Sequence, residues 1–97
     1  MAYRLSFSPQ ALHDIGAAHT WYEQCSPGLG AEFLAAIELQ LTRLQQAPML
    51  YAEVMEGVRR ALLPRFPYGL FFACRDDRVH VLAVLHHARD PRHWPHR

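Results

Sequence analysis

The sequence contains no lysine, little cysteine and no long apolar run. All ten basic residues are Arg, whose planar guanidinium suits carboxylates, phosphates and aromatic faces. The two cysteines, Cys25 and Cys74, lie far apart, and we predict free, mostly buried thiols rather than a disulfide. No stretch approaches the ~18 apolar residues that a membrane span needs, and no apolar signal region follows Met1. We therefore expect a cytoplasmic protein.

The length and composition predict a single domain over residues 1–97. Of the 97 residues, 51% are hydrophobic and 11% aromatic, so the chain can bury a small core without metal or disulfide. A domain of this size buries roughly 60–65% of its unfolded surface, which leaves a thin margin of stability that a partner would widen.

The small net charge of +1 hides a segregation of sign along the chain. Residues 1–56 carry two Arg against six acidic residues, and residues 57–97 carry eight Arg against three. The first part therefore has a net charge of −4 and the second of +5. An Arg-rich codon preference would explain the absence of lysine, but the segregation suggests that the C-terminal half faces an anionic partner.

The apolar pattern predicts a strand, two helices and three further strands. Residues 3–7 alternate as a half-buried strand does. Ser8-Pro9 is a typical helix start, and a stripe of Leu12, Ile15, His19 and Tyr22 predicts a helix to about residue 24. Trp21 lies off this stripe. A turn at Ser26-Pro27-Gly28 precedes a second helix, about 30–47, so the two helices form an antiparallel hairpin.

The remaining half predicts strands over residues 57–63, 68–74 and 79–86. The order is β-α-α-β-β-β, which we interpret as an α+β fold: an antiparallel sheet with an N-terminal helix hairpin packed on one face. Residues 79–85 are apolar except for His80, as in a central strand that is covered on both faces.

Familiar catalytic and metal patterns are missing from the chain. His86 and His87 are adjacent on a strand and point to opposite faces, and Pro95 interrupts the His93-x-x-His96 spacing, so we predict no metal site and no cofactor. Neither cysteine has an evident base or helix start beside it. The sequence also has no phosphate-binding glycine loop and no nucleophile elbow.

Arginine and histidine side chains gather in the second half of the sequence. The strand that begins at Arg59 and the last strand are expected to bring a set of them to one small surface: Arg59, Arg60, Arg65, His86, His87, Arg89 and Arg92. Such a surface would bind RNA phosphates and move protons, or dock acidic protein segments, or simply be solvated. The residue types alone leave these three interpretations open.

Four stretches of the sequence resemble the RelE/ParE toxins of bacterial type II toxin–antitoxin systems. They are residues 3–9 with Ala11, Asp14-Ile15 and Trp21-Tyr22; residues 26–30 with 32–34; residues 58–60 through 65–68; and residues 79–91 with Trp94. The run His86-His87 followed by Arg89-Asp90-Pro91 is close to the closing motif of this family. The resemblance spans nearly the whole chain and implies a growth-inhibiting, plasmid-stabilisation type of toxin that a cognate antitoxin wraps and neutralises. Trp21 and Leu39, both off the core stripes, are candidate antitoxin contacts.

The resemblance is compatible with two activities, and the residues of this sequence favour one of them. RelE-like members cleave messenger RNA on the ribosome with a set of basic residues and a tail Tyr. Here Arg60 and Arg89 fit two of those places, but Leu62 and Gly69 occupy two others and no Tyr follows Tyr68. His86 or His87 would then have to act as acid or base. We therefore favour a ParE-like, non-enzymatic inhibitor of DNA gyrase over the ribosome-dependent ribonuclease. Its expected target- or antitoxin-binding residues are Trp21, Arg59, Arg60, Arg65, Tyr68, Arg89, Arg92 and Trp94.

Overall fold

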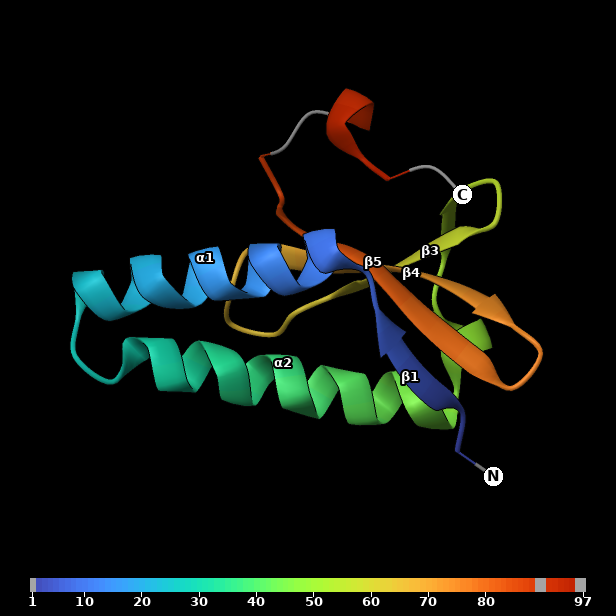
Figure 1. The fold of residues 1–97 in the computed structure, drawn as a ribbon, viewed down its shortest axis with the longest axis horizontal. Coiled ribbons are helices and arrows are strands. Elements are labelled where there is room, and N and C mark those ends of the chain that lie inside the picture. Colours follow the sequence, from blue (N-terminus) through green and yellow to red (C-terminus); the bar gives the residue numbers. More distant parts are fainter. Residues whose placement is uncertain (1, 89–90, 96–97) are drawn as a thin grey trace.

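The computed structural model describes residues 2–88 and 91–95, and in them a helix hairpin covers one face of a five-stranded sheet (Figure 1). The helices are α1 (Pro9–Cys25) and α2 (Leu29–Gln46). The strands are β1 (Arg4–Phe7), β2 (Glu53–Met55), β3 (Val58–Leu62), β4 (Tyr68–Arg75) and β5 (Arg78–His86). Short 3₁₀ turns, η1 (Pro48–Leu50) and η2 (Pro91–His93), follow α2 and β5. The predicted α+β architecture is confirmed.

The sheet differs from the expected one in two details. Its order is β1-β5-β4-β3-β2, and β1 pairs with β5 in parallel, so the sheet is mixed rather than antiparallel. The short strand β2 was not predicted. It has three residues and an irregular register with β3, too short for an alternating pattern to be recognised in the sequence.

Two local features of the sequence set the geometry of the helix hairpin. Ser8 caps α1, because its Oγ accepts a hydrogen bond from the Ala11 N–H at 3.0 Å. Between the helices, Gly28 takes φ +89, a conformation that glycine adopts at little cost. The Glu23 carboxylate then accepts hydrogen bonds from the N–H groups of Gly28 and Gly30 at the start of α2, both at 3.0 Å. These two bonds lower the pKa of Glu23.

The main core lies between the helices and the sheet, and it is rich in aromatic rings that mostly meet edge-on. Tyr22 and Phe33 from the helices contact Phe66 and Tyr68 with ring centroids 5.0–6.1 Å apart. Not every residue of the predicted stripe on α1 is buried there, since Leu12 is 58% exposed. Trp21 is equally exposed, as predicted.

A β-bulge in β5 explains how this strand contributes to both faces. Phe72 pairs with Val81 and Phe71 with Ala83, so Leu82 is the extra residue. Before the bulge, Val79 and Val81 point to the helices. After it, Val84 does so, while Ala83 and Leu85 join a second cluster on the opposite face of the sheet, called here the open face.

Candidate functional site

A groove lies between α1 and the C-terminal half of β5 and is named here the α1–β5 groove. Pairing between β1 and β5 ends at Phe7 and Val81, and beyond that point α1 takes the place of a neighbouring strand. Asp14 accepts a hydrogen bond from the Val84 N–H at 3.0 Å, and the Ser8 hydroxyl donates to the Leu82 carbonyl at 2.7 Å. These side chains satisfy backbone groups that the bulge and the end of β1 leave unpaired.

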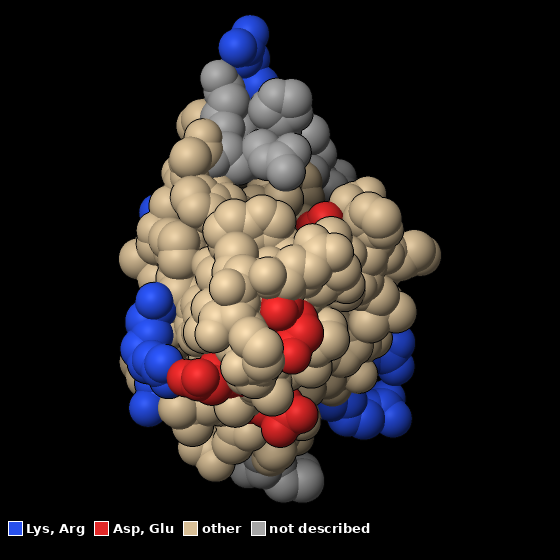
Figure 2. All heavy atoms as spheres, turned by 90° about the vertical axis from the view of Figure 1, so that its left-hand side faces the viewer, with Lys and Arg blue, Asp and Glu red and all other residues tan. Residues whose placement is uncertain are grey.

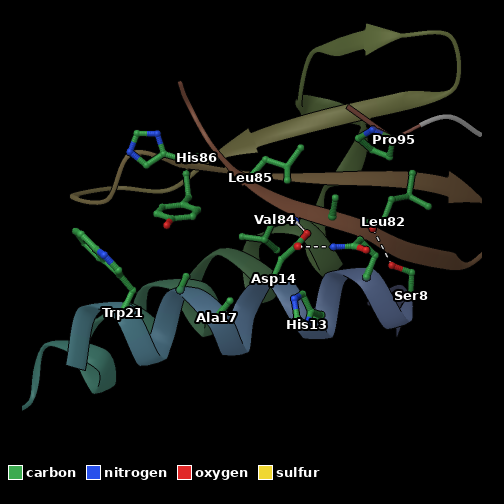
Figure 3. A pocket seen from close by; sticks show the side chains of 14 residues that line it. Ser8, His13, Asp14, Ala17, Trp21, Leu82, Val84, Leu85, His86 and Pro95 are labelled. Atoms are coloured by element: carbon green, nitrogen blue, oxygen red, sulfur yellow. Dashed lines mark hydrogen bonds between the residues drawn. The ribbon is translucent and has the colours of Figure 1, made fainter. Parts of the chain in front are cut away.

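The groove is large enough to receive a peptide segment. Its volume is about 790 Å³. In Figure 3 Trp21 projects from α1 toward His86 at one end of the groove, and Pro95 lies near Leu82 at the other. The lining is mixed in character and consists of Ser8, Gln10, His13, Asp14, Ala17, Ala18, Trp21, Tyr68, Leu82, Ala83, Val84, Leu85, His86 and Pro95.

A shallower depression, named here the α1 hollow, adjoins the groove along the outer side of α1. It is lined by His13, Gly16, Ala17, Thr20, Trp21 and Gln24. No atom lies within 4 Å of where a Cβ on Gly16 would be, so the packing of this chain does not explain a glycine there. A glycine inside an exposed helix costs stability relative to alanine. The small residues beside a large exposed indole make a surface onto which a partner backbone can pack closely.

The open face carries a second aromatic site, formed by the tail. Trp94 packs on Phe71 with ring centroids 5.1 Å apart, and the Arg60 guanidinium lies 5.1 Å from the centre of the Trp94 ring. Underneath is the apolar cluster of Val58, Phe71, Ala83 and Leu85. The side chain of Arg60 is therefore held in a cation–π contact over apolar residues.

The structure does not bring the predicted basic residues to one surface. Arg60 faces the open side, whereas Arg59 points to the opposite face and donates to the Tyr51 carbonyl at 2.6 Å. Their grouping was wrong because adjacent strand residues point to opposite faces. Arg65, which has φ 72, forms an ion pair of 2.7 Å with Glu32. Arg92 is exposed.

The residues of the alternative ribonuclease set are also separated. His86 pairs with Tyr68 across the β4–β5 ladder, and the centroids of their rings lie 5.3 Å apart on the helix side of the sheet. Arg60 lies on the open face. His87 is exposed, and its N–H donates to the Pro67 carbonyl at 2.7 Å. Arg89 lies outside the described residues. The described members of this set therefore do not converge on one point where a phosphodiester could react.

Tyr22 and Cys74 have raised pKa values, so both are poor nucleophiles. Burial raises the pKa of Tyr22, with Tyr68 and Cys25 adding to the shift. Burial likewise raises the pKa of the half-buried Cys74, against a smaller opposing effect of Arg59. Cys25 is exposed, contrary to our expectation, because it ends α1 at the hairpin tip. In the described ranges, no three His, Cys, Asp or Glu side chains are grouped to hold a metal ion.

Some residues that shape the site gave no clear signal in the sequence. The roles of Ser8 and Asp14 in the α1–β5 groove depend on the bulge, which the continuous apolar run of β5 conceals. Gly16 could have been noticed, since it interrupts a helix without ending it.

Across residues 2–88 and 91–95, no helix is long and apolar enough to cross a bilayer.

The order of elements, with the helix hairpin on one face of the sheet and the tail on the other, defines a small α+β domain, and comparison with known proteins shows its family. A family model described as the ParE toxin of the type II toxin–antitoxin system, parDE, matches residues 5–91. The chain belongs to this family of type II toxins. No curated protein matches the sequence closely enough to be significant.

Two solved structures show how far the fold is shared. A chain of the chromosomal ParDE toxin–antitoxin system from P. aeruginosa superposes with a TM-score of 0.77 at 22% identity, over 88% of this chain and 96% of that one. A chain of the RelBE2 toxin–antitoxin complex from Mycobacterium tuberculosis gives a TM-score of 0.63 at 21% identity, over 89% and 99%. At these identities the comparison shows the common fold.

Proposed function

We propose that this toxin inhibits DNA gyrase by binding it, without catalysing a reaction itself, and that a cognate antitoxin neutralises it. The observation that carries the proposal is the separation of the ribonuclease set. The Arg60 guanidinium contacts the Trp94 ring on the open face of the sheet, and His86 contacts Tyr68 on the helix side. Leu62, 51% exposed, stands where a ribonuclease of the family would have a basic residue. The match to a ParE family model points the same way.

The antitoxin is proposed to occupy the α1–β5 groove and the α1 hollow. Both solved relatives come from toxin–antitoxin systems, and α1 exposes Leu12 and Trp21, each by 58%. Large exposed apolar side chains beside a groove are typical of interaction sites. A segment that folds on binding would cover this surface and widen the thin stability margin of so small a domain.

Controlled expression in bacteria without the antitoxin tests the choice of target. If gyrase is bound, cells should filament and induce a DNA-damage response while transcripts stay intact, and the purified chain should inhibit supercoiling in vitro. His87→Ala should leave this toxicity unchanged, because no proton transfer is involved. New transcript ends within translated codons, abolished by His87→Ala, would instead establish the ribonuclease. Unchanged growth with a soluble, folded chain would contradict both.

A further inference from the structure

A row of three arginines lies beside the turn between β4 and β5, at the ends of three neighbouring strands. The proposed function does not use it. Arg4 pairs with Arg78 across the β1–β5 ladder, and Arg78 pairs with Arg75 across the β4–β5 ladder. Directly opposed residues point to the same face of a sheet, so the three side chains form one row across three strands. All three residues are exposed.

The row lies on the open face, beyond the apolar cluster that the tail covers. Leu5, Val79 and Val81 face the helices, so the alternate positions face the other way. The next row along the strands confirms this alternation, since the Ser6 hydroxyl lies 2.7 Å from His80 Nδ1. Ala73 pairs with His80 and adds no bulk. The arginine row is therefore followed by Ser6, Ala73 and His80, which are smaller than the arginines.

Within the molecule, the charges of this row are only partly balanced. Arg4 forms an exposed ion pair with Asp77 at 3.5 Å, and Asp76 lies beside Asp77 in the turn. Among the described residues, the side chains of Arg75 and Arg78 have no hydrogen bond, ion pair or ring contact. Like charges directly opposite each other destabilise a sheet. The fold gains nothing from this pairing, which points to an external anion.

The distribution of charge over the molecule adds little to the preference of an anion for this end. Glu23 in the last turns of α1 and Glu32 in the first turn of α2 flank the turn between the helices. Figure 1 places this turn at the opposite end of the long axis from the turn between β4 and β5. Figure 2, which views the molecule from the side of the α1–α2 turn, shows acidic side chains in the middle and lower part of that face, with basic side chains on both flanks. Arg65 neutralises Glu32 at the helix end, and Asp76 and Asp77 offset part of the positive charge at the other. The difference in charge between the two ends is therefore small, and the contacts of the row itself carry the preference.

We propose that Arg4, Arg75 and Arg78 bind the phosphate backbone of double-stranded nucleic acid, without reading its sequence. Guanidinium groups form charge-assisted, bidentate hydrogen bonds with phosphate oxygens. The row lies flat across exposed strands, where a long duplex can pass without needing a cleft. Proteins that hold single strands stack the bases on exposed aromatic side chains. Beside this row Ser6 and Ala73 offer no ring, and the His80 ring is half-buried with its Nδ1 2.7 Å from the Ser6 hydroxyl. A duplex, which presents phosphates and hides its bases, fits better. The inference does not depend on which target the toxin inhibits.

The proposal is tested by fluorescence anisotropy with the purified full chain and a labelled DNA duplex of about 20 base pairs, titrated between ~50 and ~200 mM salt. Arg75→Gln and Arg78→Gln should each weaken binding roughly two- to fivefold, as expected for an exposed ionic contact. Each should also reduce the slope of log K against log salt by about 0.9. Asp77→Asn should strengthen binding, because it releases Arg4.

The matched control is Arg43→Gln, which removes an exposed arginine in the last turn of α2 and should lower affinity less than either row variant. Circular dichroism of each variant checks that it is folded. The proposal is overturned if the row variants bind the duplex as the unmodified chain does, or if Arg43→Gln has an equal effect. It is also overturned if a single strand of the same length, or poly-glutamate, binds more tightly through these arginines than the duplex does.

Discussion

Gly30 is a residue at which the absence of a side chain lets the two helices approach. A Cβ there would lie 2.8 Å from His19 Cδ2 and 2.9 Å from both the His19 carbonyl oxygen and Glu23 Oε1. The two side chains could rotate away, but the carbonyl belongs to α1 itself. Any added atom must therefore push the helices apart at the point where Glu23 caps α2.

Gly30→Ala should for this reason destabilise the fold by about 1–3 kcal/mol, the usual cost of overpacking. The matched change is Gly16→Ala, also within a helix, where no atom lies within 4 Å of the added Cβ. That substitution should stabilise the chain by roughly 0.5–1 kcal/mol through helix propensity alone. Urea unfolding of both variants measures the two values. Equal effects at the two positions would refute the close approach of the helices.

At the scale of single elements, α1 and β5 are joined by side chain to backbone bonds at the bulge. Asp14→Ala would leave the Val84 N–H without its acceptor, which should cost about 1–2 kcal/mol. Hydrogen exchange of the Val84 amide should accelerate at the same time. Gln10→Ala is the control, because Gln10 only donates an exposed hydrogen bond to Asp14 at 2.7 Å and should change stability by less than ~0.5 kcal/mol. An unchanged Val84 exchange rate in Asp14→Ala would contradict this account.

The elements also show which parts of the fold the periodicity of the sequence predicts. Both helices and four of the five strands follow from apolar spacing and from Ser8-Pro9 and Ser26-Pro27-Gly28, and the structure confirms them. Three features did not follow: the parallel pairing of β1, the three-residue β2 and the bulge at Leu82. Each of these depends on which strand becomes the neighbour, and local spacing does not determine that.

The candidate site was less predictable for the same reason. Trp21 could be assigned to the surface, because its angular offset from the apolar stripe of α1 is a local property. The arginines could not be placed so simply. Whether Arg59 faces Tyr51 or the open side, and whether Arg4 comes to lie beside Arg78, depends on register and strand order.

At the scale of the whole molecule, the two surfaces proposed for the antitoxin and for the duplex lie on different sides. The helix side bears the α1–β5 groove and the α1 hollow, and the open face bears the tail over its apolar half and the arginine row beyond it. An antitoxin on the helix side would therefore leave the arginine row accessible. Binding of antitoxin and binding of a duplex are expected to be compatible.

Trp21 is the residue through which the antitoxin surface is best tested. It is 58% exposed and touches Tyr22 edge-on with ring centroids 5.0 Å apart. Removing it should therefore cost the isolated fold less than ~1 kcal/mol. A buried aromatic anchor typically contributes about 2 kcal/mol or more to an interface, so Trp21→Ala should weaken antitoxin binding about 30-fold.

Titration calorimetry of the purified toxin with its purified cognate antitoxin gives the affinity. Thermal unfolding of the free toxin gives the stability. Leu50→Ala is the matched control, since Leu50 is 84% exposed on η1, outside the groove and the hollow. If Leu50→Ala weakened the complex and Trp21→Ala did not, the antitoxin would have to bind near the end of α2. If both left affinity unchanged, neither exposed apolar side chain would be part of the interface.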